Sequence, residues 1–379
     1  MGEKPQYDIA IAGGGLAGLS LAIQSAYAGF NVLLLEKEEY PFHKVCGEYI
    51  SFESWDFLES LGLPLSEWDL PKINKLEVTD VYGKSFRFEL PLGGFGISRY
   101  LLDHSLYRLA VQKGVNVLTS TKVKDIEFID DRFVITTDNS RYTAKVAVGS
   151  YGKRSNLDVK WVRAFIRDKA DKLSNYIGVK YHIEYPLQTD LIALHNFYNG
   201  YCGISKIEGD KCCFCYLTTA ANLKAAGNSI KEMEKRFLHR NPRLEEIFSR
   251  AKFLYEEPLT ISQISFRKKS QLVDHILMLG DAAGMITPLC GNGMSMALRS
   301  SQLAFEKIYL YLKNQITRDQ LELEYMNTWK EEFNERLWWG RQIQRFFGGN
   351  KRTSFFLRTM KQFPSLSSRL IRATHGQPF

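Results

Sequence analysis

The sequence predicts an α/β fold in which a parallel sheet is joined to a second, mainly β lobe and a helical C-terminal region. Short buried strands alternate with helical patterns up to about residue 160. Aromatic-rich strand patterns separated by polar turns follow, and residues beyond Asp319 show helical periodicity. A chain of 379 residues with 45% apolar composition is long enough to bury a substantial core.

The first elements form a strand, a glycine-rich turn, a helix and a second strand. Residues 7–12 (YDIAIA) are a short apolar run, and the small and apolar residues after the turn recur at helical spacing. Gly29 is expected to end the helix, and residues 31–35 (NVLLL) supply the second buried strand. This order predicts a βαβ unit with parallel strands and a right-handed crossover.

The glycine turn carries the chemistry of this unit. Gly13, Gly15 and Gly18 have the spacing G-x-G-x-x-G, which permits a tight turn, close approach of a pyrophosphate and close packing of helix on sheet. The anion would lie at the positive end of the helix dipole. Glu36 follows the second strand, where a carboxylate can bind a ribose hydroxyl. The unit predicts a dinucleotide site but leaves NAD and FAD open.

The later elements follow from the same patterns. Residues 163–268 change to aromatic-rich strand patterns separated by polar turns, and the helix near 230–239 is the one evident helix there. The remaining expected elements are helices over 51–61, 98–113 and 292–312, strands over 115–118, 144–148 and 276–279, and a hairpin over 122–137 that turns at Asp130 and Asp131.

A second glycine-rich segment, Gly280-Asp281-Ala282-Ala283-Gly284, follows the buried strand at 276–279. Asp281 at a strand end can bind ribityl hydroxyls, and the amides of Gly291, Asn292 and Gly293 can face a flavin ring. An Asp that only caps a helix is the competing interpretation. Together with the first unit, this segment favours FAD over NAD.

Most of the net charge of +8 comes from the end of the chain. Nine Arg or Lys and no Asp or Glu lie between Arg336 and Phe379, so the remainder has 41 basic and 42 acidic residues. A basic surface for nucleic acid is therefore not expected. The basic residues interleave with aromatic ones, which suits an anionic membrane surface, an acidic partner such as an acyl carrier protein, or aromatic packing on the core. The aromatic residues are Trp338, Trp339, Phe346, Phe347, Phe355, Phe356 and Phe363.

The cysteines predict neither a disulfide framework nor a metal site. Cys212, Cys213 and Cys215 lie close together, but no fourth ligand has finger-like spacing, and neighbouring strand residues point to opposite faces. No signal peptide or uninterrupted apolar span is evident. We expect a cytoplasmic protein, with peripheral association at the inner membrane surface left open.

Five motifs resemble the geranylgeranyl reductase-like branch of the flavoprotein monooxygenase superfamily, to which the aromatic hydroxylases belong. They are GGGLAG at 13–18, LLLEK at 33–37, KVCGEYIS at 44–51, ISRYLLD at 97–103 and GDAAGMITPLCGNG at 280–293. The resemblance covers roughly residues 6–310. It implies a discontinuous Rossmann-like domain that binds FAD in an extended form.

The resemblance also implies where FAD lies. Glu36 would lie near the ribose, Arg99 near the pyrophosphate, Val123 beside adenine, and Asp281 near pyrophosphate and ribityl. Lys37 is a further cofactor-binding candidate. Cys46, Gly47 and Glu48 would border the flavin and substrate cavity. The loop that would border the flavin ring comprises Pro288, Cys290, Gly291, Asn292 and Gly293. Cys46, Glu48 and Cys290 are the catalytic candidates, although no acid or base is assigned.

Two departures from the family pattern bear on the reaction. Relatives have an Asp-Gly pair after the strand near Val148, where this chain has Ser150-Tyr151-Gly152, so NAD(P)H as the direct reductant is in doubt. Flavin halogenases carry a Trp-rich motif where residues 200–206 read GYCGISK, which ranks halogenation low.

The resulting hypothesis is an FAD-dependent oxidoreductase that reduces, desaturates or hydroxylates an apolar prenyl, lipid or polyketide-like small molecule. The alternative is a non-catalytic lipid-binding escort protein that keeps the flavoprotein fold. The expected FAD-binding domain comprises residues 1–72, 97–160 and 270–325, and the substrate lobe 73–96 and 161–269. Residues 326–379 form the basic, aromatic-rich C-terminal region.

Overall fold

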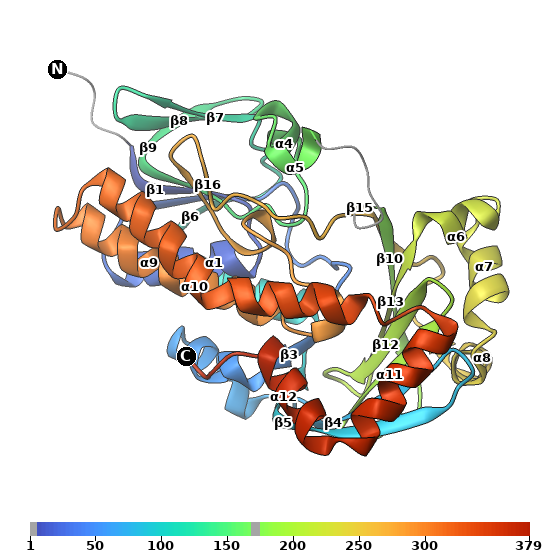
Figure 1. Cartoon of the computed structure of the whole chain (residues 1–379). Coiled ribbons are helices and arrows are strands. Elements are labelled where there is room, and N and C mark those ends of the chain that lie inside the picture. Colours follow the sequence, from blue (N-terminus) through green and yellow to red (C-terminus); the bar gives the residue numbers. More distant parts are fainter. Residues whose placement is uncertain (1–5, 168–174) are drawn as a thin grey trace.

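The computed structural model describes residues 6–167 and 175–379, and its strands form two sheets (Figure 1). The first sheet contains the predicted βαβ unit, in which β1 pairs in parallel with both β2 and β9. Its strands are, in spatial order, β16 (Leu272–Val273), β17 (Ile276–Met278), β9 (Arg141–Gly149), β1 (Tyr7–Ala12), β2 (Val32–Leu35) and β6 (Asn116–Leu118). The predicted hairpin, β7 (Asp125–Ile129) and β8 (Arg132–Thr136), extends from β9.

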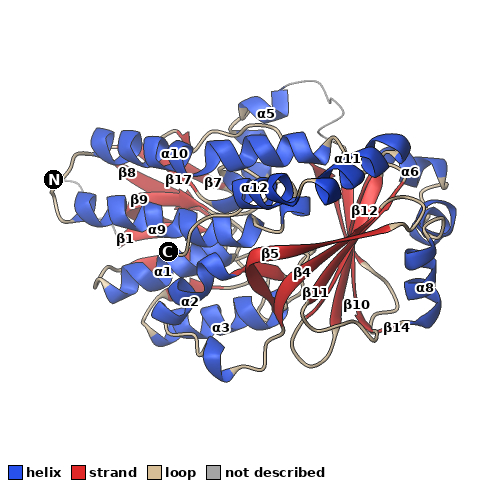
Figure 2. Cartoon of the chain, turned by 60° about the horizontal axis from the view of Figure 1, so that its bottom comes forward, coloured by secondary structure: helices blue, strands red, loops and turns tan. Residues whose placement is uncertain are grey.

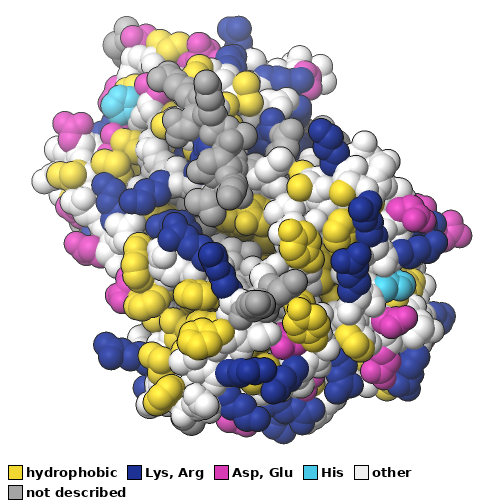
Figure 3. All heavy atoms as spheres, turned by 45° about the vertical axis from the view of Figure 1, so that its right-hand side comes forward, with side chains coloured by type: hydrophobic (Ala, Val, Ile, Leu, Met, Phe, Trp, Pro, Cys, Tyr) yellow, Lys and Arg dark blue, Asp and Glu magenta, His cyan; other side chains and the backbone are white. Residues whose placement is uncertain are grey.

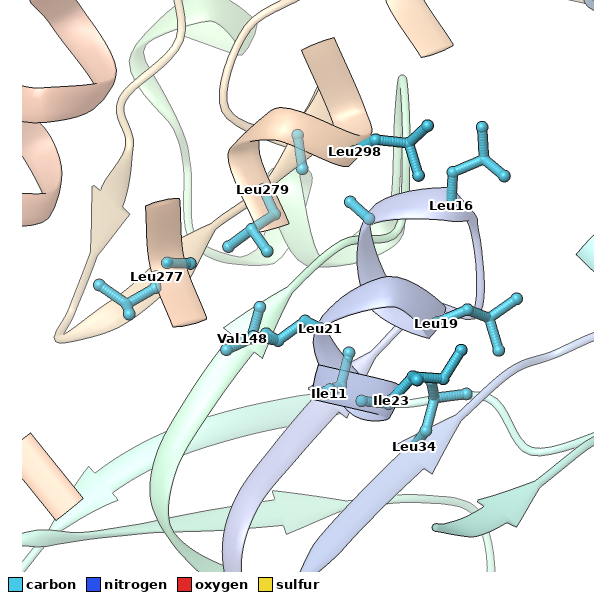
Figure 4. Close-up of a cluster of buried hydrophobic side chains, with 14 of the residues drawn as sticks. Ile11, Leu16, Leu19, Leu21, Ile23, Leu34, Val148, Leu277, Leu279 and Leu298 are labelled. Carbon is cyan, nitrogen blue, oxygen red and sulfur yellow. The ribbon is translucent and has the colours of Figure 1, made fainter. Parts of the chain in front are cut away.

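The late segment of the chain returns to the first sheet, as the sequence predicts. β17 pairs in parallel with β9, with Leu277 opposite Val148. Figure 4 shows Ile11 of β1, Leu34 of β2 and Val148 of β9 in one cluster of buried side chains with Leu279 and Leu298. Their apolar contacts are a dominant stabilising contribution here. The helices of this region are α1 (Leu16–Tyr27), α2 (Trp55–Ser60), α3 (Arg99–Gln112), α4 (Asn156–Lys160), α5 (Ala164–Arg167), α9 (Gly293–Leu312) and α10 (Arg318–Gln344).

The second sheet is mainly antiparallel. Its strands are, in spatial order, β14 (Lys252–Phe253), β10 (Tyr176–Glu184), β13 (Cys212–Thr219), β12 (Gly200–Lys206), β11 (Leu191–Phe197), β4 (Lys72–Thr79), β5 (Ser85–Gly96) and β3 (Tyr49–Ser51), with β15 (Leu259–Ile264) also on β10. β11 and β4 pair in parallel, which joins the strands of residues 72–96 to those beyond residue 175. β3 was not expected, because three residues are too few to show a period.

Helices cover the second sheet on both faces. α6 (Ala220–Ala225), α7 (Ile230–Met233), the π-helix at Glu234–Leu238 and α8 (Pro242–Arg250) lie on the side of β10, β12 and β13 that faces away from the first sheet (Figure 2). The expectation of a single helix there is wrong, because Asn241 caps α8 and Pro242 begins it. On the other face lie α11 (Asn350–Gln362) and α12 (Pro364–Thr374), against β5.

The predicted fold class is confirmed. A parallel sheet carries the glycine turn, a mainly antiparallel second sheet follows, and helices form the C-terminal region. Within the described chain, every helix is too short or too polar to span a lipid bilayer.

Candidate functional site

The glycine turn lies between β1 and α1. Gly13 has a φ of +112°, and a Cβ atom there would be 2.7 Å from the backbone of Ser150. A Cβ on Gly18 would be 2.1 Å from the carbonyl oxygen of Gly13. These two glycines are therefore required by the packing of the turn itself. They hold the loop after β9 against the loop after β1.

Gly15 differs from Gly13 and Gly18 because a Cβ atom there would clash with nothing. The nearest heavy atoms to a Cβ there are Arg99 Nη2 at 3.8 Å and Lys44 Nζ at 3.9 Å. Gly15 also precedes the first residue of α1, where amide groups are free to bind an anion. An open position beside two cations and a helix N-terminus fits a pyrophosphate.

The two cations share one carboxylate. Arg99 Nε and Nη2 donate to Asp103 at 2.6 and 2.8 Å, and Lys44 Nζ donates at 2.9 Å. Burial raises the pKa of Asp103, but the charges of Arg99 and Lys44 outweigh burial and hold the pKa below its ordinary value. The cluster keeps a net positive charge, which complements a diphosphate.

Glu36 is buried at the end of β2. Its Oε2 accepts the N–H of Gly14 at 2.8 Å, and its Oε1 accepts the N–H of Glu38 at 3.1 Å. A carboxylate has four acceptor positions, so further positions remain for ribose hydroxyls. Lys37 instead points to solvent, and Val123 lies half-buried between β6 and β7.

Asp281 lies in the turn after β17, half-buried. The main chain of this turn is held by two buried cations: Lys269 donates to the carbonyl of Asp281 at 2.7 Å, and Arg163 donates to that of Ala282 at 2.9 Å. Burial lowers the pKa of Lys269 to about 8. The turn therefore presents Asp281 from a rigid backbone.

Tyr151, which replaces the family's acid, belongs to the same scaffold. Its hydroxyl donates to Asp158 at 2.7 Å and accepts from Arg163 at 3.2 Å. Arg163 also pairs with Asp158 at 2.8 Å. Tyr151 thus positions the arginine that holds the Asp281 turn, a structural role that its sequence context did not indicate.

The expected flavin-bordering loop forms a short turn that leads into α9. Gly291 has a φ of +69°, and Asn292 donates to the carbonyl of Thr374 at 2.6 Å. Pro288 is exposed, and Gly293 begins α9. Burial raises the pKa of the Cys290 thiol to about 11, so the thiol is neutral near pH 7.

The other bordering segment, Lys44 to Glu48, lies against the second sheet. Cys213 Sγ donates to the carbonyl of Cys46 at 3.2 Å, and Lys180 donates to that of Lys44 at 3.1 Å. Cys46 is half-buried and Gly47 is exposed. This segment brings the glycine-turn region and the second sheet together.

Glu48 is fully buried, and both of its carboxylate oxygens have hydrogen-bond partners within the protein. Its carboxylate accepts hydrogen bonds from Lys180 Nζ, from His182 Nε2 at 2.6 Å and from the N–H of Arg99 at 2.8 Å. Burial would raise the pKa of Glu48, but His182 and Lys180 outweigh burial and hold the pKa below its ordinary value. Glu48 is therefore a buried, charged carboxylate at the place where the glycine-turn region meets the second sheet.

A chain of hydrogen bonds continues from Glu48 toward the surface. The Tyr255 hydroxyl lies 2.7 Å from His182 Nδ1 and 3.0 Å from His43 Nε2. Burial and then Lys180 lower the pKa of His43 to about 4, so His43 is neutral near pH 7. Lys180 and His182 were not predicted as site residues. The signal that could have identified them is the presence of two polar residues at alternate positions of an apolar strand.

The ligand atoms of Glu48, His182 and Cys213 lie within 4.8 Å of one another, which is the spacing of a metal site. Here Glu48 and His182 bond each other, and the Lys180 ammonium lies on the same carboxylate. The protein's own cation thus takes the place that a metal ion would need.

An apolar cavity of about 140 Å³ lies between the second sheet and the C-terminal helices. Strands β4, β5 and β11 form one wall, α11 and α12 form another, and the turn at Pro288–Gly291 forms part of the rim. Its apolar lining comprises Leu76, Val78, Phe88, Leu90, Ile192, Leu194, Ile343, Phe347, Phe356, Leu357, Met360, Leu370 and Ile371.

Comparison with protein-family models matches residues 8–44 to the FAD binding domain. The matched residues are those of β1, the glycine turn, α1, β2 and the loop that ends at Lys44. The match lies on the segment for which the glycine spacing and Glu36 predict a dinucleotide site. Proteins similar to this chain include digeranylgeranylglycerophospholipid reductases and a flavin-dependent brominase.

Curated relatives are similar over most of the chain at low identity. Conditioned medium factor receptor 1 of Dictyostelium discoideum is 23% identical over 87% of this chain and 69% of that protein. Digeranylgeranylglycerophospholipid reductase 1 of Methanothermobacter thermautotrophicus is 23% identical over 79% and 76%. The 1H-pyrrole-2-carbonyl-(peptidyl-carrier protein) brominase of Pseudoalteromonas luteoviolacea is 24% identical over 81% and 78%.

Solved structures share the fold. A flavin-dependent brominase superposes with a TM-score of 0.79 at 19% identity, over 97% of this chain and 93% of that chain. A geranylgeranyl bacteriochlorophyll reductase-like protein from Thermoplasma acidophilum has a TM-score of 0.76 at 16% identity, over 98% and 96%. A halogenase in complex with phloroglucinol and FAD has a TM-score of 0.75 at 17% identity, over 97% and 85%.

Proposed function

We propose that the protein is an FAD-dependent oxidoreductase that reduces, desaturates or hydroxylates an apolar substrate of prenyl, lipid or polyketide-like chemistry. The observation that carries the proposal is the position of the apolar cavity. The cavity reaches Cys290 and Gly291, which belong to the same segment as the Asp281 turn. A substrate held there would lie beside the loop expected to border the flavin ring.

In this proposal the residues of the first sheet hold FAD. Gly15, Lys44 and Arg99 receive the pyrophosphate, Glu36 the ribose, and Asp281 the ribityl chain. When bound, FAD supplies the redox chemistry. The chain binds and orients the cofactor, and the apolar walls and the C-terminal helices exclude water from the substrate.

The electron donor is proposed to be another protein or the substrate rather than NAD(P)H. Tyr151 stands where relatives carry an acid, and its hydroxyl is bonded to Asp158 and Arg163. An aromatic side chain bonded within the scaffold offers no carboxylate to a nicotinamide cofactor.

The visible spectrum tests the proposal. We expect the purified protein, supplied with FAD, to show bound flavin, and anaerobic NADPH to reduce that flavin slowly or not at all. A protein that stays colourless after FAD addition would support the escort-protein alternative and remove the enzyme proposal. Once a substrate is found, oxygen consumption separates the reactions, because hydroxylation requires oxygen and alkene reduction does not. Halogenation ranks below hydroxylation and alkene reduction, because residues 200–206 contain neither tryptophan of the halogenase motif.

For the partner, the C-terminal helices support an anionic lipid surface. Phe355 is 75% exposed and Phe363 is 55% exposed, in a region without acidic residues. Figure 3 shows basic side chains gathered along the lower edge of the molecule, beside hydrophobic ones. Other aromatic residues of the same region, Phe347 and Phe356, instead line the cavity. A membrane bound here would lie directly outside the cavity wall.

Vesicle binding tests the lipid surface. We expect Phe355→Ser with Phe363→Ser to weaken binding to phosphatidylglycerol vesicles by about tenfold, because two exposed apolar side chains are lost. Leu323→Ser is the matched control. Leu323 is 55% exposed and lies near the N-terminal end of α10, whereas Phe355 and Phe363 follow the C-terminal end of that helix in the chain. Added salt should weaken binding. Binding to an acyl carrier protein without any binding to vesicles would overturn this assignment.

A further inference from the structure

The cavity wall contains a small number of polar side chains. Thr374 Oγ1 donates to the carbonyl of Ile371 at 2.8 Å, and His375 Nδ1 bonds the same carbonyl at 2.8 Å. Cys290 Sγ lies 3.5 Å from Thr287 Oγ1. Thr374 Oγ1, His375 Nδ1 and Cys290 Sγ therefore each have a partner within the protein.

The hydroxyl of Tyr49 is different. Tyr49 lines the cavity and is only 5% exposed, and its Oη has no hydrogen-bond partner among the residues that the structure describes. A buried hydroxyl without a partner is unfavourable and rare in folded proteins. Such a donor is expected to find its partner in a bound molecule.

The position of the Tyr49 ring is tightly defined. The ring lies between Gly94 on β5 and Gly291 in the turn before α9: a Cβ on Gly94 would be 2.6 Å from Tyr49 Cζ, and a Cβ on Gly291 would be 3.0 Å from Tyr49 Cδ1. Both glycines leave room for the ring. Burial, together with the nearby charge of Glu53, raises the pKa of Tyr49, so its hydroxyl stays a neutral donor.

We propose that Tyr49 Oη donates a hydrogen bond to an oxygen atom of the substrate, and that the cavity thereby selects apolar molecules that carry a carbonyl, ether or alcohol oxygen. The oxygen would lie beside Gly291, at the rim nearest the proposed flavin position. This inference rests on the proposed function only in taking the cavity as the substrate site.

The size of the cavity defines the probes. A cavity of about 150 Å³ is known to bind benzene, so the 140 Å³ cavity accepts a single ring with small substituents. Acetophenone and α-methylstyrene have nearly the same shape, but acetophenone alone has a carbonyl oxygen. The ratio of their dissociation constants therefore reports the hydrogen bond.

The experiment measures both constants by titration calorimetry on protein supplied with FAD, for the wild type and for Tyr49→Phe. We expect the preference for acetophenone to fall by about five- to tenfold in Tyr49→Phe, the worth of one hydrogen bond, while the affinity for α-methylstyrene stays unchanged. Taking the ratio across variants cancels the difference in how water solvates the two probes. A melting temperature close to that of the wild type shows that Tyr49→Phe is folded.

Tyr201→Phe is the matched control. The Tyr201 hydroxyl is also buried, but Tyr201 is not among the residues that line the cavity. The control should leave the ratio of dissociation constants unchanged.

Two results would overturn the inference. One is an unchanged ratio in Tyr49→Phe, as expected if a water molecule bridges Tyr49 to the buried Glu53. The other is a wild type that binds neither probe. The flavin absorbance of the same samples tests the proposed function separately. A changed ratio in a protein that binds no flavin would support the hydrogen bond from Tyr49 and contradict the proposal of an FAD-dependent oxidoreductase.

Discussion

Replacing Gly15 by alanine is expected to lower FAD affinity by about 100-fold or more, about 2.7 kcal/mol of binding free energy, while leaving the fold intact. Gly15 has an extended backbone, with φ −85° and ψ −173°, which alanine adopts without strain. The added methyl group would meet no atom closer than 3.8 Å in the protein. It would occupy the open space beside Arg99 and Lys44 that the pyrophosphate is proposed to enter.

The measurement is a flavin fluorescence titration together with urea unfolding. Gly349→Ala is the matched control: Gly349 also has a negative φ, −106°, and a Cβ there would have its nearest neighbour at 3.8 Å. Gly349 precedes α11, away from the glycine turn, so its variant should keep FAD affinity. Undiminished FAD binding by Gly15→Ala would show that the pyrophosphate does not approach this turn.

Gly18→Ala is expected to act differently, because a Cβ there would be 2.1 Å from the Gly13 carbonyl and 2.5 Å from Ser150 Oγ. This substitution should lower both stability and FAD affinity. The contrast between the two variants separates the glycine that the cofactor needs from the glycine that the turn needs.

Lys180→Met is expected to lower the free energy of unfolding by about 3–5 kcal/mol, because it leaves Glu48 charged, buried and without its cation. Both side chains of this pair are completely buried. Urea unfolding at neutral pH measures the loss. The control is Lys75→Met: Lys75 pairs with Asp190 at 2.7 Å, but their side chains are 41% and 32% exposed, so the expected loss is much smaller than that of Lys180→Met.

The pH dependence of this variant has a defined sign. With Lys180 present, the pKa of Glu48 is held low, so the stabilisation by Glu48 is present at neutral pH and is lost as pH falls through that lowered pKa. Without Lys180, burial acts to raise the pKa of Glu48, and protonation relieves the buried charge. The stability deficit of Lys180→Met should therefore shrink as pH falls toward the ordinary carboxyl range.

A double variant, Glu48→Gln with Lys180→Met, tests whether the unpaired carboxylate causes the loss of stability expected for Lys180→Met. Removing both charges should recover a large part of the lost stability, because no uncompensated charge remains. If the double variant is less stable than Lys180→Met alone, the loss comes from packing rather than from the unpaired carboxylate.

The amino-acid sequence by itself determined the dinucleotide-binding unit. The signals lie within the first 36 residues and follow one another in order: buried strand, glycine spacing, helix and acid. Each reflects a short-range requirement of backbone conformation or periodicity, which neighbouring residues reveal. The Asp281 segment was recognised for the same reason, as were the parallel first sheet and the helical C-terminal region.

Only the tertiary structure decided what surrounds that unit. Glu48 meets Lys180 and His182 because the loop before β3 lies against β10, a contact between segments more than 130 positions apart. The same packing of distant segments places α11 and α12 over the cavity that Tyr49 lines, and it buries the Tyr49 hydroxyl without a partner among the described residues. Ion pairs and cavities depend on which surfaces meet in three dimensions, and local sequence periodicity does not indicate which distant segments pack together.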